Sequence, residues 1–144
     1  MSQIIRKAIA ADYPLLGDIW LSASIKAHSF VPDEFWVSKV DIMRDEYLPA
    51  SETWVIENGG CLAGFFCLVD DVLAAIFIAP EWQGNGCGSQ LMEKAKKLRL
   101  RLELSVYTAN SSAIDFYKFH GFKIVEERQD VHTSCAEFVM EWKG

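Results

Sequence analysis

The sequence lacks the features that mark several common classes of protein. Its 144 residues include no uncharged apolar run of about 18 residues or more, and residues 1–7 lack the charged-then-apolar order of a signal peptide. Repeats, low-complexity tracts and linkers are also missing. We therefore expect a single domain over residues 1–144, located in the cytoplasm and without a membrane partner.

Metal-binding patterns are missing as well. The four cysteines, Cys61, Cys67, Cys87 and Cys135, form no C-x-x-C pair, and the three histidines are scattered. We expect no metal, no disulfide framework and reduced thiols. Cys61 and Cys67 are interpreted as small apolar fillers of a strand. Cys87, at a helix start, has either a lowered pKa and some reactivity or the simpler role of a small residue in a turn.

Positive charge is scarce. The chain has 14 Lys and Arg against 20 Asp and Glu, for a net charge of −6. Because phosphate contacts supply most of the affinity for nucleic acid, no nucleic-acid partner is expected. An acidic surface suits an amine or a basic peptide instead.

What the sequence does contain is a glycine-rich loop, Gln83-Gly84-Asn85-Gly86-Cys87-Gly88-Ser89, between a strand-like apolar run and a helix-like segment. Glycines at alternate positions let successive backbone N–H groups approach one anion, and the helix N-terminus adds further unpaired donors. A dinucleotide fingerprint would need a third glycine at Ser89 or Leu91, and a Walker loop would need a Gly-Lys pair. The remaining pattern, Q-x-x-G-x-G, predicts a phosphate cradle.

Hydrophobic periodicity indicates a mixed α/β chain. The expected strands cover residues 4–8, 53–57, 61–69, 72–79, 102–106, 122–127 and 135–142, and the expected helices cover 11–23, 33–49, 88–98 and 110–120. The second helix should end at Pro49. The run at 72–79 is almost continuously apolar, as is typical of a strand buried on both faces. The strand, helix, strand order around the loop predicts one parallel pair with a right-handed crossover.

Two motifs in this order resemble the GNAT superfamily of N-acyltransferases. One runs from Ile76 to Gly88, and the other, from Asn110 to Phe122, reads N-x-x-A-x-x-F-Y-x-x-x-G-F. The resemblance covers essentially the whole chain. It implies the GNAT fold, a mostly antiparallel α/β sheet with one parallel pair splayed at the acyl-CoA site and helices on both faces. It also implies transfer of an acetyl group from acetyl-CoA to a primary amine, by direct attack in a ternary complex and without a metal.

The resemblance further implies which residues bind the donor. Backbone groups of Phe77 and Ile78 would pair with the pantetheine arm as if it were another strand. The loop of residues 83–89 would hold the pyrophosphate, with Gln83 offering a neutral hydrogen bond where the family often has Arg. The other expected contacts to the donor come from Asn110, Ala113, Phe116 and Tyr117. For Phe116, plain core packing is an equal alternative.

Tyr117 corresponds to the family's general acid. A phenol with a pKa of about 10 keeps its proton at pH 7 and can donate it to the thiolate that leaves as CoA. The structural alternative is an amphipathic tyrosine on a helix face.

The general base is not apparent. Many relatives carry Glu in the strand before the glycine loop, but residues 72–78 of this chain contain no acid. His28, Glu103 and Tyr107 are the candidates, and deprotonation of the amine through water is equally open.

The acceptor amine also stays open, since a protein N-terminus, a lysine or a small amine would each fit. The expected acceptor wall comprises His28, Phe30 and Tyr107, with Phe35 and Trp36 nearby. Monomer and homodimer are both compatible with the sequence, because an exposed strand edge invites pairing. The missing strand acid motivates one alternative, a catalytically silent acyl-CoA-binding module, and an interaction protein that uses the fold as a scaffold is a third possibility.

Overall fold

The computed structural model describes residues 3–144, so that Met1 and Ser2 of the N-terminal segment discussed above lie outside it. Its strands form one seven-stranded sheet in the order β1-β2-β3-β4-β5-β7-β6. These strands are β1 (Gln3–Lys7), β2 (Glu52–Asn58), β3 (Cys61–Val69), β4 (Val72–Ile78), β5 (Arg101–Tyr107), β6 (Lys123–Gln129) and β7 (Ala136–Lys143). Neighbouring strands are antiparallel except for β4 and β5, which are parallel.

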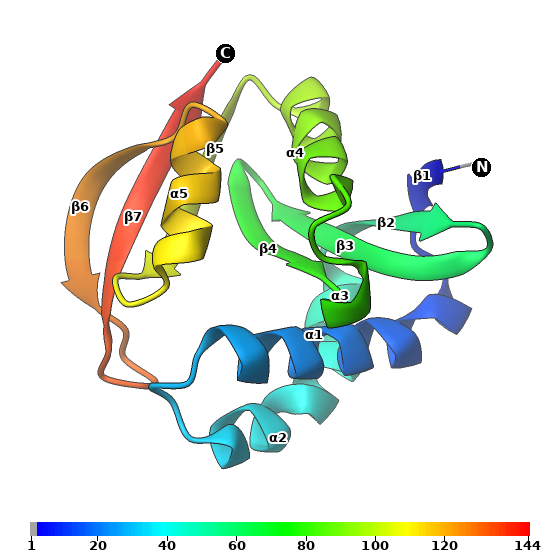
Figure 1. Cartoon of the computed structure of the whole chain (residues 1–144), viewed down its shortest axis with the longest axis horizontal. Coiled ribbons are helices and arrows are strands. Elements are labelled where there is room, and N and C mark those ends of the chain that lie inside the picture. The colour runs from blue at the N-terminus through cyan, green and yellow to red at the C-terminus, as the bar shows by residue number, and fades with distance from the viewer. Residues whose placement is uncertain (1–2) are drawn as a thin grey trace.

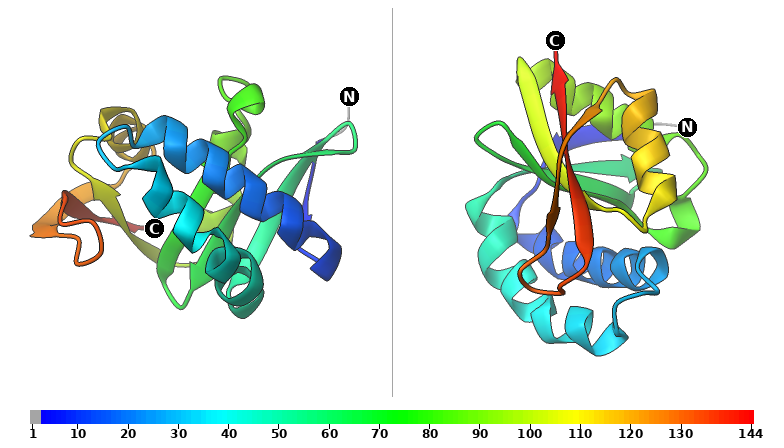
Figure 2. Two further views of the ribbon diagram at one scale, coloured as in Figure 1. Left: turned by 90° about the horizontal axis from the view of Figure 1, so that it is seen from below. Right: turned by 90° about the vertical axis from the view of Figure 1, so that its left-hand side faces the viewer.

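Helices cover both faces of the sheet (Figures 1 and 2). Helices α1 (Tyr13–Ala27) and α2 (Asp33–Ile42) pack on one face, over a core that includes Phe65. Helices α4 (Cys87–Leu98) and α5 (Ser111–Phe119) pack on the other face, over a core that includes Phe66. The two phenylalanines are consecutive in β3 and point to opposite faces, as successive strand residues must. The predicted fold class is confirmed.

The second helical segment differs from the prediction at its end. Helix α2 gives way to a π-helical turn, Met43–Tyr47, and a short α3 (Leu48–Ala50) continues the helical path past Pro49. Pro49 follows this turn and Leu48, and the chain stays helical for one residue beyond it, to Ala50. The prediction that the helix ends at Pro49 is therefore wrong.

Strand β4 packs into the cores on both faces of the sheet, as the apolar run had suggested, but it is not buried along its whole length. Its first four residues alternate between exposed and buried, and residues 76–78 are half-buried. A β-bulge changes which face the residues of β4 point to. Leu68 of β3 pairs with Leu73, whereas Cys67 pairs with Ala75, which leaves Ala74 as an extra residue. Because of this bulge, Leu73 packs in the core beneath α4 and Ala75 in the core beneath α1.

Strands β4 and β5 separate directly after they meet. Their only paired positions are Val72 and Glu103, within the described residues 3–144. The rest of β4 is held by β3 and the rest of β5 by β7. The predicted parallel pair is thus confirmed, and it is splayed.

The cysteines of β3 differ from one another. Cys67 is buried, and burial raises the pKa of its thiol to about 11, so its expected role as an apolar filler agrees with the structure. Cys61 is exposed, because it directly follows the turn at Gly59 and Gly60, both of which have positive φ. The interpretation of Cys61 as a filler is wrong.

Gly64 sets how closely β3 approaches β4 beside the splay. A Cβ at this position would lie 2.5 Å from Ile78 Cδ1 and 2.6 Å from the Phe77 carbonyl oxygen. The second of these atoms belongs to the backbone and can move only with the strand. A side chain at position 64 would therefore displace β4.

We expect Gly64→Ala to lower the free energy of unfolding by about 1–3 kcal/mol, because the added methyl overpacks the contact between β3 and β4. Urea denaturation followed by circular dichroism measures this change. Cys61→Ala, on the same strand but exposed, is the matched control and should shift stability by less than about 0.5 kcal/mol. A Gly64→Ala protein as stable as the wild type would contradict the close approach.

Candidate active site

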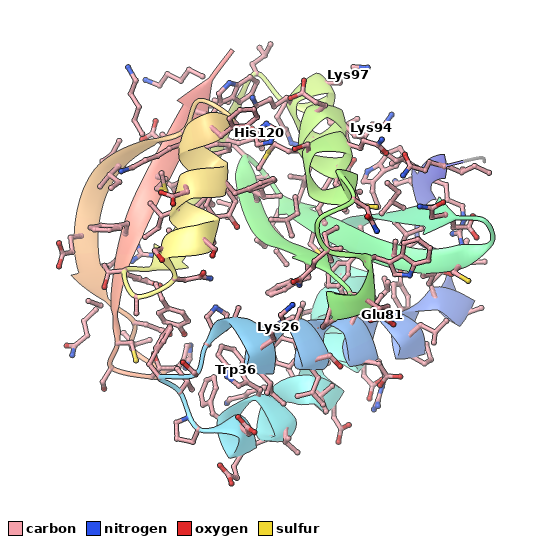
Figure 3. The ribbon with its side chains drawn as sticks, viewed as in Figure 1. Lys26, Trp36, Glu81, Lys94, Lys97 and His120 are labelled. Carbon is pink, nitrogen blue, oxygen red and sulfur yellow. The ribbon has the colours of Figure 1, made fainter. Side chains whose placement is uncertain are left out.

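A cavity of about 860 Å³ lies between the diverging strands. Residues 73–78 of β4 line one side of it and residues 104–107 of β5 the other. Lys26 and Trp36 reach it from α1 and α2, beneath the strands (Figure 3). The bulge and the splay therefore create the space that the sheet would otherwise fill.

Most of the residues predicted from the sequence line this cavity. They are His28, Phe77, Ile78, Gln83, Gly84, Gly86, Cys87, Gly88, Ser89, Tyr107, Asn110, Ala113, Phe116 and Tyr117. Asn85, Phe30 and Glu103 do not line it. Asn85 is exposed on the outer side of the loop. Phe30 instead lines a neighbouring hollow of about 310 Å³ and touches the cavity wall through Tyr107, at a ring-centroid distance of 5.4 Å.

The glycine loop has the backbone geometry of an anion site. Gly84 and Gly86 have φ values of 83° and 82°, which a residue with a side chain rarely adopts. Helix α4 begins directly after them, at Cys87. Within residues 3–144, the backbone N–H groups of residues 84–89 donate no hydrogen bond to the protein. These unpaired donors at a helix N-terminus fit the pyrophosphate of an acyl-CoA.

Lys26 adds a positive charge that sequence reasoning missed. Its Nζ donates to Gln83 Oε1 at 2.8 Å, and Gln83 Nε2 donates in turn to the Ile78 carbonyl oxygen at 3.0 Å. The ammonium group thus lies beside the loop position where the family often has Arg. No motif marked Lys26, because it comes from α1, 57 positions earlier in the chain.

His120 supports the loop from α5, and sequence reasoning missed it too. Its Nε2 lies 3.1 Å from Ser89 Oγ, and its Nδ1 lies 3.5 Å from Glu93 Oε2. The ring is buried, and burial lowers the pKa of His120. A neutral imidazole therefore fixes the side chain of Ser89 at the start of α4.

Cys87 does not have the lowered pKa that its position allowed. The residue is buried in the core beneath α4. Burial raises the pKa of its thiol. The simpler reading, a small residue at the turn into the helix, agrees with the structure.

Tyr117 lies on the cavity wall from the α5 side. Its ring packs against Phe116 and Phe122, with centroid distances of 5.6 and 5.8 Å. Burial raises the pKa of Tyr117 to about 12, so the phenol keeps its proton at pH 7. Within residues 3–144 its hydroxyl makes no hydrogen bond to protein, which leaves the O–H available to a ligand in the cavity.

His28 is buried in the wall rather than solvated in a loop. It stacks on Trp36 at 5.0 Å, and burial lowers the pKa of its imidazole. Asn110 caps α5 by accepting the Ala113 N–H through Oδ1, which turns its Nδ2 toward His28 Nε2 at 3.4 Å. The Nε2 lone pair thus faces a donor, and the Nδ1 atom is buried without a hydrogen-bond partner.

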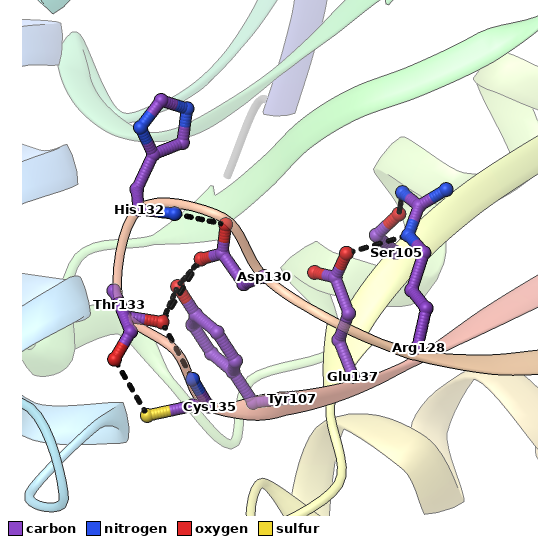
Figure 4. A network of polar contacts seen from close by, with 8 residues as sticks. All are labelled: Ser105, Tyr107, Arg128, Asp130, His132, Thr133, Cys135 and Glu137. Atoms are coloured by element: carbon purple, nitrogen blue, oxygen red, sulfur yellow. Dashed lines mark hydrogen bonds and ion pairs between the residues drawn. The ribbon is translucent and has the colours of Figure 1, made fainter.

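Tyr107 is engaged in a polar network on the same side (Figure 4). Its hydroxyl donates to Asp130 Oδ2 at 2.6 Å, and Thr133 Oγ1 donates to the same carboxylate oxygen at 3.0 Å. Burial and this carboxylate raise the pKa of Tyr107. The phenol is therefore protonated and already paired.

Within the described residues 3–144, no group of three or more His, Cys, Asp or Glu side chains is arranged to hold a metal ion. Over the same residues, every helix is too short or too polar to cross a membrane.

The family assignment follows from comparison with known proteins. The model of a family described as an acetyltransferase (GNAT) domain matches residues 49–124, a range that contains both motifs. The chain belongs to the GNAT family of acetyltransferases. The expected resemblance is confirmed, and with it the class of enzyme, the acyltransferases.

Individual relatives of this GNAT chain agree with the assignment. Peptidyl-lysine N-acetyltransferase YiaC of Escherichia coli K12 is 33% identical over 140 residues, which cover 96% of each chain. The solution structure of apo YjaB from Escherichia coli superposes with a TM-score of 0.87 at 28% identity and covers 100% of this chain and 99% of that one. The PaiA N-acetyltransferase of Thermoplasma acidophilum, solved with coenzyme A, gives a TM-score of 0.84 at 21% identity with full coverage of both chains.

The two buried histidines make stability depend on pH. Burial lowers the pKa of His28 and His120 from about 6.5, so the unfolded chain binds more protons than the folded one as pH falls below 6.5. We expect the free energy of unfolding to decrease from pH 7 to pH 5, by at most about 1.4 kcal/mol per pH unit for each proton. The carboxylates with lowered pKa affect stability only at lower pH; they are Asp12, Asp45, Glu52 and Asp130.

Urea unfolding at several pH values measures this dependence. His28→Gln should make the decrease shallower, whereas His132→Gln, at an exposed loop position, should leave the slope unchanged. An unaltered slope in His28→Gln would rule out a neutral, buried His28.

Proposed function

We propose that this protein transfers the acetyl group of acetyl-CoA to the ε-amino group of lysine side chains in proteins or peptides. One observation carries the proposal: a single cavity between β4 and β5 is lined both by the unpaired N–H donors of the glycine loop and by Tyr117. Donors for a pyrophosphate and an acid for a leaving thiolate are the two parts that acyl transfer from CoA needs.

Lysine is the favoured acceptor for two reasons. Relatives at 33% and 31% identity are named peptidyl-lysine N-acetyltransferases. The net charge of −6 also favours the approach of a basic peptide over that of an anionic one.

The transfer is a direct attack in a ternary complex. The lysine ammonium first loses one proton, the neutral amine nitrogen then bonds to the thioester carbonyl carbon, the C–S bond breaks, and the nitrogen loses a second proton as the amide forms. Tyr117 donates its O–H to the leaving sulfur. Because its pKa of about 12 lies above that of a thiol, the phenol acts mainly as a hydrogen-bond donor and keeps its proton. The proton that the nitrogen loses as the amide forms ends on the CoA sulfur.

Deprotonation of the amine proceeds through water. Strand β4 has no acid, and Glu103 lies outside the cavity lining. Tyr107 is bound to Asp130 and has a raised pKa, while the Nε2 atom of His28 faces the Asn110 amide. These contacts disfavour each of the three candidate side chains as a base.

Incubation with acetyl-CoA and a peptide that carries one lysine and a blocked N-terminus tests the proposal. We expect acetyl-lysine by mass spectrometry together with release of free CoA thiol. If calorimetry detects binding of CoA but no amine in a broad panel releases thiol, the protein is the silent acyl-CoA-binding module. If CoA does not bind at all, only the scaffold reading survives.

We expect Tyr117→Phe to lower turnover about 100-fold or more while the affinity for acetyl-CoA stays within about twofold, because the variant loses only the O–H. Steady-state kinetics and calorimetry measure the two effects. Tyr47→Phe, at a tyrosine that is 62% exposed, is the control and should match the wild type. Full turnover in Tyr117→Phe would remove Tyr117 from the acid role.

We expect Cys87→Ala to retain turnover, because the buried thiol with its raised pKa does not carry the acyl group. Initial rates at varied concentrations of both substrates should give intersecting lines. Loss of activity in Cys87→Ala together with parallel lines would instead indicate an acyl-enzyme.

A further inference from the structure

The cavity has one acidic side chain among the residues that line it, Glu137 of β7. Sequence reasoning sought an acid in β4 and found none, and nothing in the two motifs pointed to β7. The lining also holds one ammonium group, that of Lys26 at the glycine loop. The two charges come from different walls, one beside the expected phosphates and the other on the sheet beyond β5.

Sheet register fixes where Glu137 points. Glu137 lies directly opposite Tyr107 of β5 and Arg128 of β6, so the three side chains share one face of the sheet. On that face Tyr107 contacts His28, with ring centroids 5.1 Å apart. The carboxylate of Glu137 therefore lies on the side of the expected acceptor wall rather than on the side of α4.

Within residues 3–144, one oxygen of the Glu137 carboxylate is hydrogen-bonded and the other is not. Arg128 Nε donates to Glu137 Oε2 at 2.7 Å, and Arg128 Nη2 donates to Ser105 Oγ at 2.8 Å (Figure 4). The other oxygen, Oε1, accepts no hydrogen bond from residues 3–144 and is turned away from Arg128 in Figure 4. The Glu137 side chain is only 13% exposed, so a cation that reached Oε1 would be largely shielded from water.

We propose that Glu137 Oε1 binds the ammonium group of the acceptor lysine and so selects a cationic side chain; this inference rests on the proposed function. An ammonium group supplies donors and a positive charge to an oxygen that has neither partner. Arg128 fixes the carboxylate from its outer side, so that the lysine meets an oriented acceptor. The positive charge of Lys26 repels a second cation from the glycine-loop end of the cavity. The two opposite charges of Lys26 and Glu137 therefore favour one orientation of donor and acceptor.

Glu137 acts on binding and not on the chemical step. The attacking nitrogen must lose a proton after it has bound, and one oxygen of the Glu137 carboxylate is already occupied by the Arg128 guanidinium. The signature of this role is a raised KM for the lysine peptide with kcat nearly unchanged. A fall in kcat without a change in KM would overturn the assignment and indicate a proton acceptor.

The test compares two peptides that differ only in charge. Their affinities are measured by calorimetry with CoA present in excess, for a blocked peptide with one central lysine and for its isosteric norleucine counterpart. We expect the wild type to bind the lysine peptide about tenfold more tightly or better, as charge-assisted hydrogen bonds generally provide. Glu137→Gln should bind both peptides alike and raise the KM for the lysine peptide about tenfold.

Glu141→Gln is the matched control. Glu141 lies four residues further along β7, pairs with Arg101 at 3.6 Å, and is outside the cavity lining. This variant should keep the preference for lysine, and urea unfolding confirms that both variants fold. Because Arg128 is half exposed, loss of its partner should leave Glu137→Gln folded.

The outcomes separate this inference from the proposed function. If the wild type prefers the lysine peptide, and Glu137→Gln does not, the assignment holds even where no acetyl-lysine forms, and only the proposed function fails. If lysine is acetylated but the wild type binds both peptides equally, or Glu137→Gln keeps the preference, the assignment is wrong and the proposed function stands.

Discussion

The separation of β4 from β5 is the constraint on which the rest of the structure depends. A parallel pair normally continues for several residues, but here the bulge at Ala74 turns β4 and leaves one paired position, Val72 with Glu103. Each strand is then stabilised from its other side, β4 by β3 and β5 by β7. The sheet can therefore open in its middle while every strand keeps a hydrogen-bonded neighbour.

This opening passes through the sheet, and different residues line it on the two faces. On the α4 and α5 side lie the glycine loop, Ser89 and Tyr117, which suit the acyl donor. On the α1 and α2 side lie His28 and Tyr107, which suit an acceptor. Under the proposed function, donor and acceptor would approach from opposite faces and meet between the strands.

The sequence was informative where a single local segment determines the structure. The glycine spacing at residues 84–88 and the apolar periodicity of residues 88–98 are local properties. They correctly predicted a tight loop followed by a helix. The bulge in β4 and its partial exposure were not predicted, because an apolar run contains no sign of a bulge, which depends on the register with β3. The sequence also left the environment of Cys87 open, because the burial of this thiol depends on residues of other strands.

Side chains that line or support the site from distant elements could not be found in the same way. Lys26, His120 and Glu137 come from α1, the end of α5 and β7, and each acts through a contact with a residue at least nine positions away. A single sequence contains no record of such pairs. Asn110 shows the contrast, since the same residue is both a local cap, which a motif reveals, and a distant partner of His28, which it does not.

The edge strand β6 has a consequence for how the molecule moves. All seven of its residues are exposed, so it contributes no side chain to either core, and it is joined to the sheet only through β7. The hydrogen bond from Tyr107 to Asp130 is thus a tie between the end of β6 and the body of the protein. A segment held by so few buried contacts opens locally at a small fraction of the global unfolding free energy. The segment beside the acceptor wall is therefore expected to open before the core strands do.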